Sequence, residues 1–204
     1  TKAVTGQILS PSINILSSTC FQRINLNKIK ILKNKYNLVM IAPTANWIGK
    51  IWPADRYLEL IMELKKKPYF KKSIFIFTGP NTERKYVKEI LNLRKPFIFD
   101  LFGKSSLIEI YHIMKHCSLF IGNDSGLMHM SSLANIKTIG LFGPSDKNTY
   151  GPWKKKNIAI SSPKSPDDLM GHKGFDSKEC GSLMFDLKTS TVLENIVYYL
   201  KSDK

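Results

Sequence analysis

Residues 118–142 read SLFIGNDSGLMHMSSLANIKTIGLF and place a strand, a turn, a short helix and a second strand in direct succession. Ser118–Gly122 and Lys137–Phe142 are continuous apolar runs, which predict strands buried on both faces. Between them, Ser125–Ala134 has the length and pattern of a short helix. Since strands joined through a helix run parallel, this stretch predicts an α/β fold with a covered parallel sheet.

The same alternation continues on both sides of this unit. Ser106 and Glu109 form a capping box that starts a helix ending near Lys115. The other expected elements are the strands Leu38–Ala42, Ser73–Thr78 and Phe97–Phe99 and the helices Asp55–Lys66, Thr82–Leu93 (with Thr82 as N-cap) and Thr191–Lys201. We therefore predict a doubly wound, mostly parallel, Rossmann-like sheet that binds ligands at the carboxyl ends of its strands.

The pattern of apolar and polar residues divides the chain into two parts. Residues 1–37 are mixed in character and are interpreted as a leading segment or interdomain linker with one strand, and residues 38–204 as the domain itself. Within the domain, Ser161–Cys180 is polar and rich in Pro and Gly, so we expect an irregular excursion there.

The composition is that of a soluble globular protein with an unusual charge. The 204 residues are 43% apolar, and this length and apolar fraction argue against disordered and fibrous classes. They carry 31 Lys+Arg against 16 Asp+Glu, a formal charge of +15. Only four basic residues are Arg, so biased composition and a functional anionic partner both remain open. Three scattered cysteines and the lack of a membrane-spanning apolar run favour the cytoplasm.

Two features of the turn after residue 122 favour binding of phosphate. Asp124 is suited to N-cap the following helix, whose first amides, at Ser125 and Gly126, would then point outward at the positive end of the helix dipole. His129 lies one turn further on. The alternative is an ordinary capped turn with a packed histidine, and for Asp-Ser-Gly alone that alternative is favoured.

Two further loops carry charged candidates. Lys50 lies in a long loop between Trp47 and Trp52, where a cation could meet phosphate oxygens or could simply be solvated. Glu83 follows the strand Ser73–Thr78, where a carboxylate can accept hydrogen bonds from ribose hydroxyls, or can merely favour the first turn of a helix.

The order and spacing of these loops resemble glycosyltransferase family 9, the heptosyltransferases that use ADP-heptose to build lipopolysaccharide. The resemblance covers about residues 38–200 and is carried by Lys50-Ile51-Trp52-Pro53, Gly79–Glu83, Asp100–Leu107, Gly122–His129 and Gly140–Asp146. It implies the C-terminal, donor-binding half of a GT-B enzyme, whose N-terminal half has no counterpart in these residues. That half is expected to supply the general base and to pack against this one.

The resemblance implies a role for each candidate. Lys50 would contact the donor phosphates and stabilise the leaving ADP. The pyrophosphate would be cradled by Asp124, Ser125 and Gly126, with His129 nearby. Glu83 would bind the ribose. It further implies an inverting transfer of heptose to a lipopolysaccharide core acceptor, without cofactor or metal; no Asp-x-Asp motif or His/Cys cluster suggests metal ligands.

Partners and alternatives follow from the same resemblance. Expected partners are a nucleotide sugar and an anionic glycolipid, with peripheral contact at the inner face of the cytoplasmic membrane and no nucleic acid. A cleft that accepts both anions would favour the +15 charge, over a lysine-rich compositional background. The alternatives are a GT-B enzyme using another nucleotide sugar, such as a UDP-sugar, and a basic α/β module that binds nucleic acid.

Overall fold

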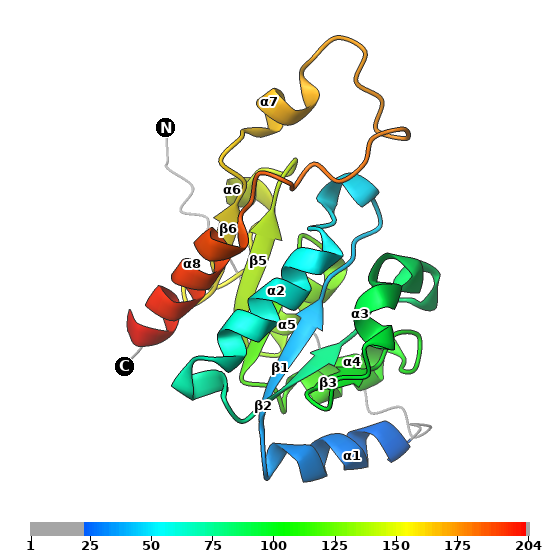
Figure 1. Cartoon of the computed structure of the whole chain (residues 1–204), viewed down its shortest axis with the longest axis vertical. Coiled ribbons are helices and arrows are strands. Elements are labelled where there is room, and N and C mark those ends of the chain that lie inside the picture. Colours follow the sequence, from blue (N-terminus) through cyan, green and yellow to red (C-terminus); the bar gives the residue numbers. More distant parts are fainter. Residues whose placement is uncertain (1–22, 203–204) are drawn as a thin grey trace, which may run out of the picture.

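A computed structural model describes residues 23–202, which form a six-stranded, fully parallel sheet with helices on both faces (Figure 1). The strands are β1 (Asn37–Ala42), β2 (Ser73–Phe77), β3 (Ile98–Asp100), β4 (Leu119–Asn123), β5 (Lys137–Phe142) and β6 (Ile158–Ser161). Their order in the sheet is β3-β2-β1-β4-β5-β6. The predicted doubly wound, Rossmann-like class is confirmed, because the order reverses between β1 and β4.

The apolar strands have a core on each side. In β1, Val39 and Ile41 belong to one core and Leu38, Met40 and Ala42 to the other, as the two-residue period of a strand requires. The first core is covered by α2 (Ala54–Lys65), α3 (Lys88–Asn92) and α8 (Thr189–Ser202), and the second by α1 (Arg23–Lys33), α4 (Leu107–Met114) and α5 (Gly126–Leu133). The continuous apolar runs in the sequence are thus explained by burial on both faces.

The expected elements are confirmed with two corrections at helix starts. The Ser106–Glu109 capping box is present at α4. In place of the predicted helix Thr82–Leu93, a 3-10 helix, η3 (Asn81–Val87), precedes the short α3, and no side chain caps η3, so Thr82 is not an N-cap. The turn is held instead by long-range bonds from Arg84, described below. Asp124 does not cap α5 either: Ser125 occupies the N-cap position without a side-chain bond, because the Asp124 carboxylate binds Lys50.

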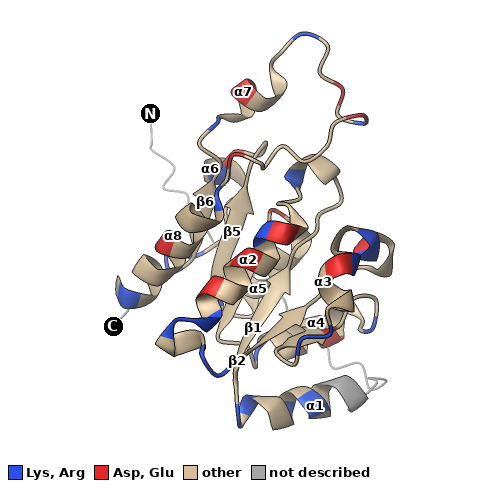
Figure 2. Ribbon diagram, in the orientation of Figure 1, with Lys and Arg blue, Asp and Glu red and all other residues tan. Residues whose placement is uncertain are grey.

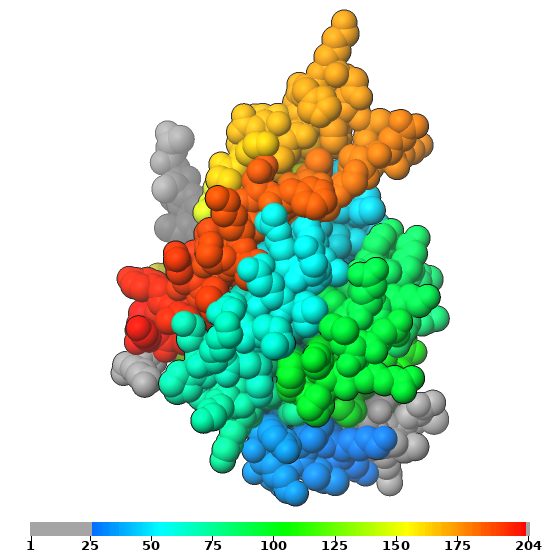
Figure 3. Space-filling model, viewed as in Figure 1, coloured from blue at the N-terminus to red at the C-terminus, as the bar shows by residue number. Residues whose placement is uncertain are grey.

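Several elements were not predicted. Residues 23–33 form α1, where a linker with one strand was expected, and its Ile29 is fully buried in the core. The strand β6 was missed, as were α6 (Lys147–Tyr150) and α7 (Pro166–Met170). The segment around α7 extends beyond the strand ends (Figures 1 and 3). The boundary between residues 37 and 38 stays a prediction, and residues 1–22, including Cys20, lie outside the described part of the chain.

Two further observations concern the thiols and the helices. Cys117 and Cys180 are free thiols. None of the helices within residues 23–202 is long and apolar enough to cross a membrane.

Candidate functional site

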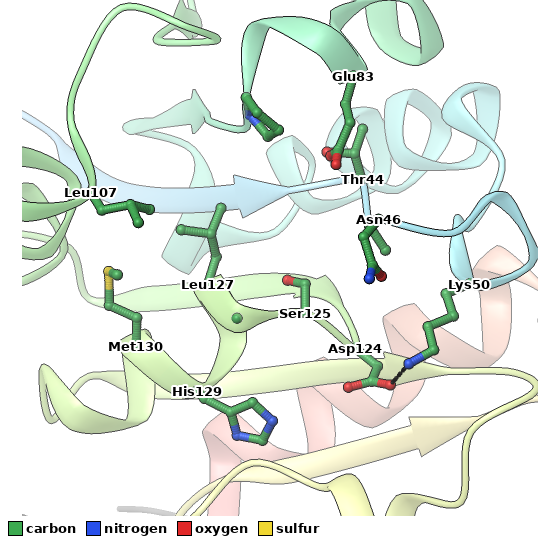
Figure 4. Close-up of a pocket in the computed structure, with 13 residues that line it drawn as sticks. Thr44, Asn46, Lys50, Glu83, Leu107, Asp124, Ser125, Leu127, His129 and Met130 are labelled. Carbon is green, nitrogen blue, oxygen red and sulfur yellow. Dashed lines mark hydrogen bonds and ion pairs between the residues drawn. The ribbon is translucent and has the colours of Figure 1, made fainter.

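A cavity of about 500 Å³ opens at the carboxyl ends of β1, β2 and β4, where the strand order reverses. Open α/β sheets bind their ligands at such a switch point. All six residues singled out in the sequence line this cavity, namely Lys50, Glu83, Asp124, Ser125, Gly126 and His129 (Figure 4). The structure therefore brings together residues that lie as far as 79 positions apart in the chain.

A cation is fixed on one wall of the cavity. Lys50 ends the short helix η1 (Ile48–Lys50), and its Nζ lies 2.6 Å from Oδ2 of Asp124, directly after β4. The Asp124 side chain is 8% exposed and that of Lys50 27%, so the carboxylate lies behind the ammonium. An ammonium has three donors. Lys50 can therefore bind an anion in the cavity while it stays paired with Asp124.

The amino end of α5 forms the floor of the same cavity. The helix begins at Gly126 after Ser125, and its first amides have no intrahelical acceptor. A Cβ placed on Gly126 would meet no atom within 4 Å, so the backbone here faces open space. The Ser125 Oγ is buried and has no hydrogen-bond partner among the described residues. The positive end of the helix dipole and the Lys50 ammonium together favour an anion in this space.

His129 lies one turn into α5, against the ring of Trp153. The two ring centroids are 4.9 Å apart with an interplanar angle of 36°, and Nδ1 is buried without a hydrogen-bond partner in the described part of the chain. Burial lowers the pKa of His129 and Lys50 lowers it further, whereas Asp124 raises it. The imidazole is consequently neutral at pH 7.

Glu83 lies across the cavity from Asp124, on η3 (Figure 4). Its neighbour Arg84 donates to both carboxylate oxygens of Asp100, at 2.7 and 3.0 Å, and Lys104 donates to the same group at 2.6 Å. Burial alone would raise the pKa of Asp100, but the hydrogen bonds from Arg84 and Lys104 outweigh it and the pKa is lowered. These bonds tie η3, and with it Glu83, to the end of β3.

A buried asparagine that was not predicted holds the Lys50 loop in place. Asn123 is fully buried; its Oδ1 accepts hydrogen bonds from the Tyr57 hydroxyl (2.8 Å) and the Trp52 amide (3.4 Å), and its Nδ2 donates to the Pro43 carbonyl (2.9 Å). Asn123 thus joins the end of β4 to the loop after β1. Its place in the Asn-Asp-Ser-Gly stretch was a signal, but its partners could not be inferred from the sequence.

A second cavity adjoins the first. It has a volume of about 330 Å³, and it shares Pro80, Leu107 and Leu127 with the larger cavity. Apart from these, its lining comes from the loops after β2 and β3 and from α4, with Gly79 and Ile110 among the residues. Within residues 23–202, no three or more His, Cys, Asp or Glu side chains cluster as metal ligands would.

The fold and the site define a Rossmann-like α/β domain with an anion-accepting cavity at its switch point. The chain belongs to the family described as glycosyltransferase family 9 (heptosyltransferase), whose model matches residues 11–173. It is 29% identical over 134 residues to lipooligosaccharide heptosyltransferase 2 of Campylobacter jejuni, a match covering 64% of this chain and 41% of that protein.

Two solved structures have the same fold. A family 9 glycosyltransferase from Veillonella parvula superposes with a TM-score of 0.71 and 20% identity, over 88% of this chain and 51% of that one. The E. coli ADP-heptose lipopolysaccharide heptosyltransferase II superposes with a TM-score of 0.66 and 21% identity, over 87% and 52%. The chain thus spans about half the length of these relatives.

Proposed function

We propose that this chain is the C-terminal, donor-binding half of an inverting glycosyltransferase that transfers heptose from ADP-heptose to a lipopolysaccharide core acceptor. One observation carries the proposal: Lys50 and the amino end of α5 converge on a single cavity, with Glu83 opposite, in a member of family 9. The name of the E. coli relative, an ADP-heptose heptosyltransferase, supports the choice of donor.

Each part of the donor has a place in this proposal. The pyrophosphate lies between Lys50 and the amides of Ser125 and Gly126, and the ribose hydroxyls donate to Glu83. The adenine enters the adjoining cavity of about 330 Å³, whose mostly apolar lining suits a base. His129 borders the phosphates.

The chemistry follows from where charge develops. Departure of ADP through an oxocarbenium-like transition state builds negative charge on the phosphate, and a fixed ammonium and a helix amino end stabilise that charge. The proposed transfer therefore needs neither a cofactor nor a divalent metal. The acceptor hydroxyl is deprotonated by a general base outside this chain, in an N-terminal domain that packs against the cavity. The enzyme acts in the cytoplasm, at the inner face of the membrane.

Calorimetry with ADP, UDP and GDP tests the donor. We expect ADP to bind this chain most tightly and to bind equally well with EDTA present. Preference for UDP would instead support a GT-B enzyme of other specificity. Because the base lies outside the chain, we expect no turnover by the chain alone, and robust heptose transfer by it would contradict the division into halves.

A further inference from the structure

The positive charge of the protein is concentrated at the sheet edge opposite the cavity. Six segments lead into the six strands and together define what we name the basic edge: residues 26–37, 64–73, 93–98, 115–119, 134–137 and 154–158. They contain sixteen Lys or Arg residues and no Asp or Glu. Nine Lys or Arg and nine Asp or Glu residues lie in the segments that follow the strands, which are residues 43–53, 78–87, 100–107, 124–125, 143–151 and 162–188. The cleft therefore does not account for the +15 charge.

Most of these basic side chains are exposed. Figure 2 shows Lys and Arg along α1 and along the loop from α2 to β2. The Asn37 amide donates to the Lys72 carbonyl at 2.9 Å, so the segments leading into β1 and β2 lie side by side. The exposed cations of the basic edge are Lys28, Lys30, Lys33, Lys35, Lys66, Lys67, Lys71, Lys72, Arg94, Lys95, Lys115, Lys154 and Lys155.

The local electrostatics agree with this concentration of charge. His116 lies at the basic edge, and its pKa is lowered mainly by burial and further by Lys33, Lys30 and His112. A group that is harder to protonate beside lysines is experiencing a positive potential. One acidic side chain borders the basic edge: Glu63, within the last turns of α2, pairs with Lys66.

Neither helix dipoles nor composition explains the pattern. Cations are favoured at the carboxyl ends of helices. That preference accounts for Lys33 and Lys65, in the last turns of α1 and α2, but not for Lys71, Lys72 or Lys155, which lie outside helices. A lysine-rich composition would enrich both edges of the sheet, whereas the opposite edge is balanced.

Apolar side chains are exposed among these lysines. Ile31, Tyr36 and Tyr69 are 62%, 40% and 52% exposed, and they lie in the two adjacent segments that lead into β1 and β2. Lysines around exposed aromatic and aliphatic side chains are typical of surfaces that lie in a membrane interface. Recognition of nucleic acid favours Arg, and the basic edge holds a single Arg, Arg94.

We propose that the basic edge docks on an anionic phospholipid bilayer, with Tyr36, Tyr69 and Ile31 in the headgroup layer. The choice of a membrane rests on the proposed function, since a lipid-linked acceptor is found there, but the surface is assigned independently of the donor site. A six-residue strand such as β1 spans about 20 Å, so the cavity faces away from the bilayer at roughly that height. A saccharide chain extending from a lipid can reach it.

Sedimentation with phosphatidylcholine vesicles, with and without phosphatidylglycerol, tests the docking of the whole chain. The test variant reverses four exposed charges of the basic edge, Lys33→Glu, Lys71→Glu, Lys72→Glu and Lys155→Glu. The control makes the same change in charge at the other edge, with Lys85→Glu, Lys173→Glu, Lys178→Glu and Lys188→Glu, all exposed as well. A lysine near an anionic surface contributes about fivefold to binding, so the first variant should lose more than about 100-fold and the control far less.

Two further measurements keep the outcome clear. Tyr36→Ser with Tyr69→Ser should weaken vesicle binding severalfold even at high salt, because that part of the binding is apolar. ADP affinity should be unchanged in the four-lysine variant, which reports an intact fold and separates this proposal from the donor assignment. Equal losses in both charge variants, binding that ignores phosphatidylglycerol, or a preference for duplex nucleic acid over vesicles in competition would each overturn the proposal.

Discussion

Replacing Gly126 with alanine tests whether a ligand lies against the first turn of α5. The added Cβ meets no protein atom within 4 Å, and Gly126 does not have a positive φ, so the protein itself accepts the methyl group. Alanine favours a helix over glycine by up to about 1 kcal/mol. The melting temperature should therefore stay unchanged or rise by up to about 4 °C.

The effect on the ligand should be opposite in sign. Gly126 lines the cavity, so the methyl group occupies space that a phosphate would use to reach the amides of α5. Loss of one hydrogen bond to a charged group costs about 1.5–3 kcal/mol. ADP should bind roughly 10- to 150-fold more weakly by calorimetry.

A matched variant separates this effect from a general one. Gly181 also has open space around its Cβ and no positive φ, but it lies outside the cavity. Gly181→Ala should keep the ADP affinity of the parent. The reasoning is refuted if Gly126→Ala binds ADP within twofold of the parent at an unchanged or raised melting temperature.

Three other predictions concern the walls of the cavity. Lys50→Met should weaken ADP binding about 10- to 100-fold and reduce its salt dependence, since it removes the fixed ammonium; an unchanged affinity in titration calorimetry would exclude Lys50 as a phosphate ligand. Glu83→Gln and Asp100→Ala should both reduce the preference for ADP over 2′-deoxy-ADP, because Asp100 fixes Glu83 through Arg84. Both variants should leave pyrophosphate binding unchanged. A preference that survives in both variants would contradict the assignment of Glu83 to the ribose. Because the pKa of His129 is lowered in the folded protein, the unfolded chain binds the proton first as the pH falls. Stability should therefore be highest above about pH 6.5 and should fall as the pH drops towards the native pKa. His129→Gln should flatten this part of the plot of melting temperature against pH, and an unchanged plot would contradict the burial argument.

The fold could be predicted because its determinants are local. Apolar runs such as Ser118–Gly122 cannot stay in water, and their alternation with amphipathic helices leaves few arrangements besides a doubly wound sheet. The capping box at Ser106 and Glu109 is likewise a bond between residues three positions apart. In contrast, β6 was missed because Ile158–Ser161 is short and follows a lysine-rich loop, so its pairing with β5 depends on the sheet already present.

Six residues that line the cavity were singled out from the sequence, but their geometry was not predicted. Lys50, Glu83 and His129 each had an ordinary alternative role, and only their order along the chain favoured a common cavity. Asp124 shows why the geometry could not be predicted. An aspartate before a helix normally caps it, but Lys50, 74 residues away, offers the Asp124 carboxylate a stronger, charge-assisted partner.

By itself, the sequence determined the strands β1 to β5, the fold class, the family resemblance and six of the residues that line the cavity, because these depend on local patterns of polarity and on motif order. Only the tertiary structure decided which partner each charge takes, that η3 is held through Arg84 and Asp100, and that the lysines gather at the edge away from the cavity. Those outcomes depend on which segments the parallel sheet brings to the same edge, and strand order is a property of the packed molecule.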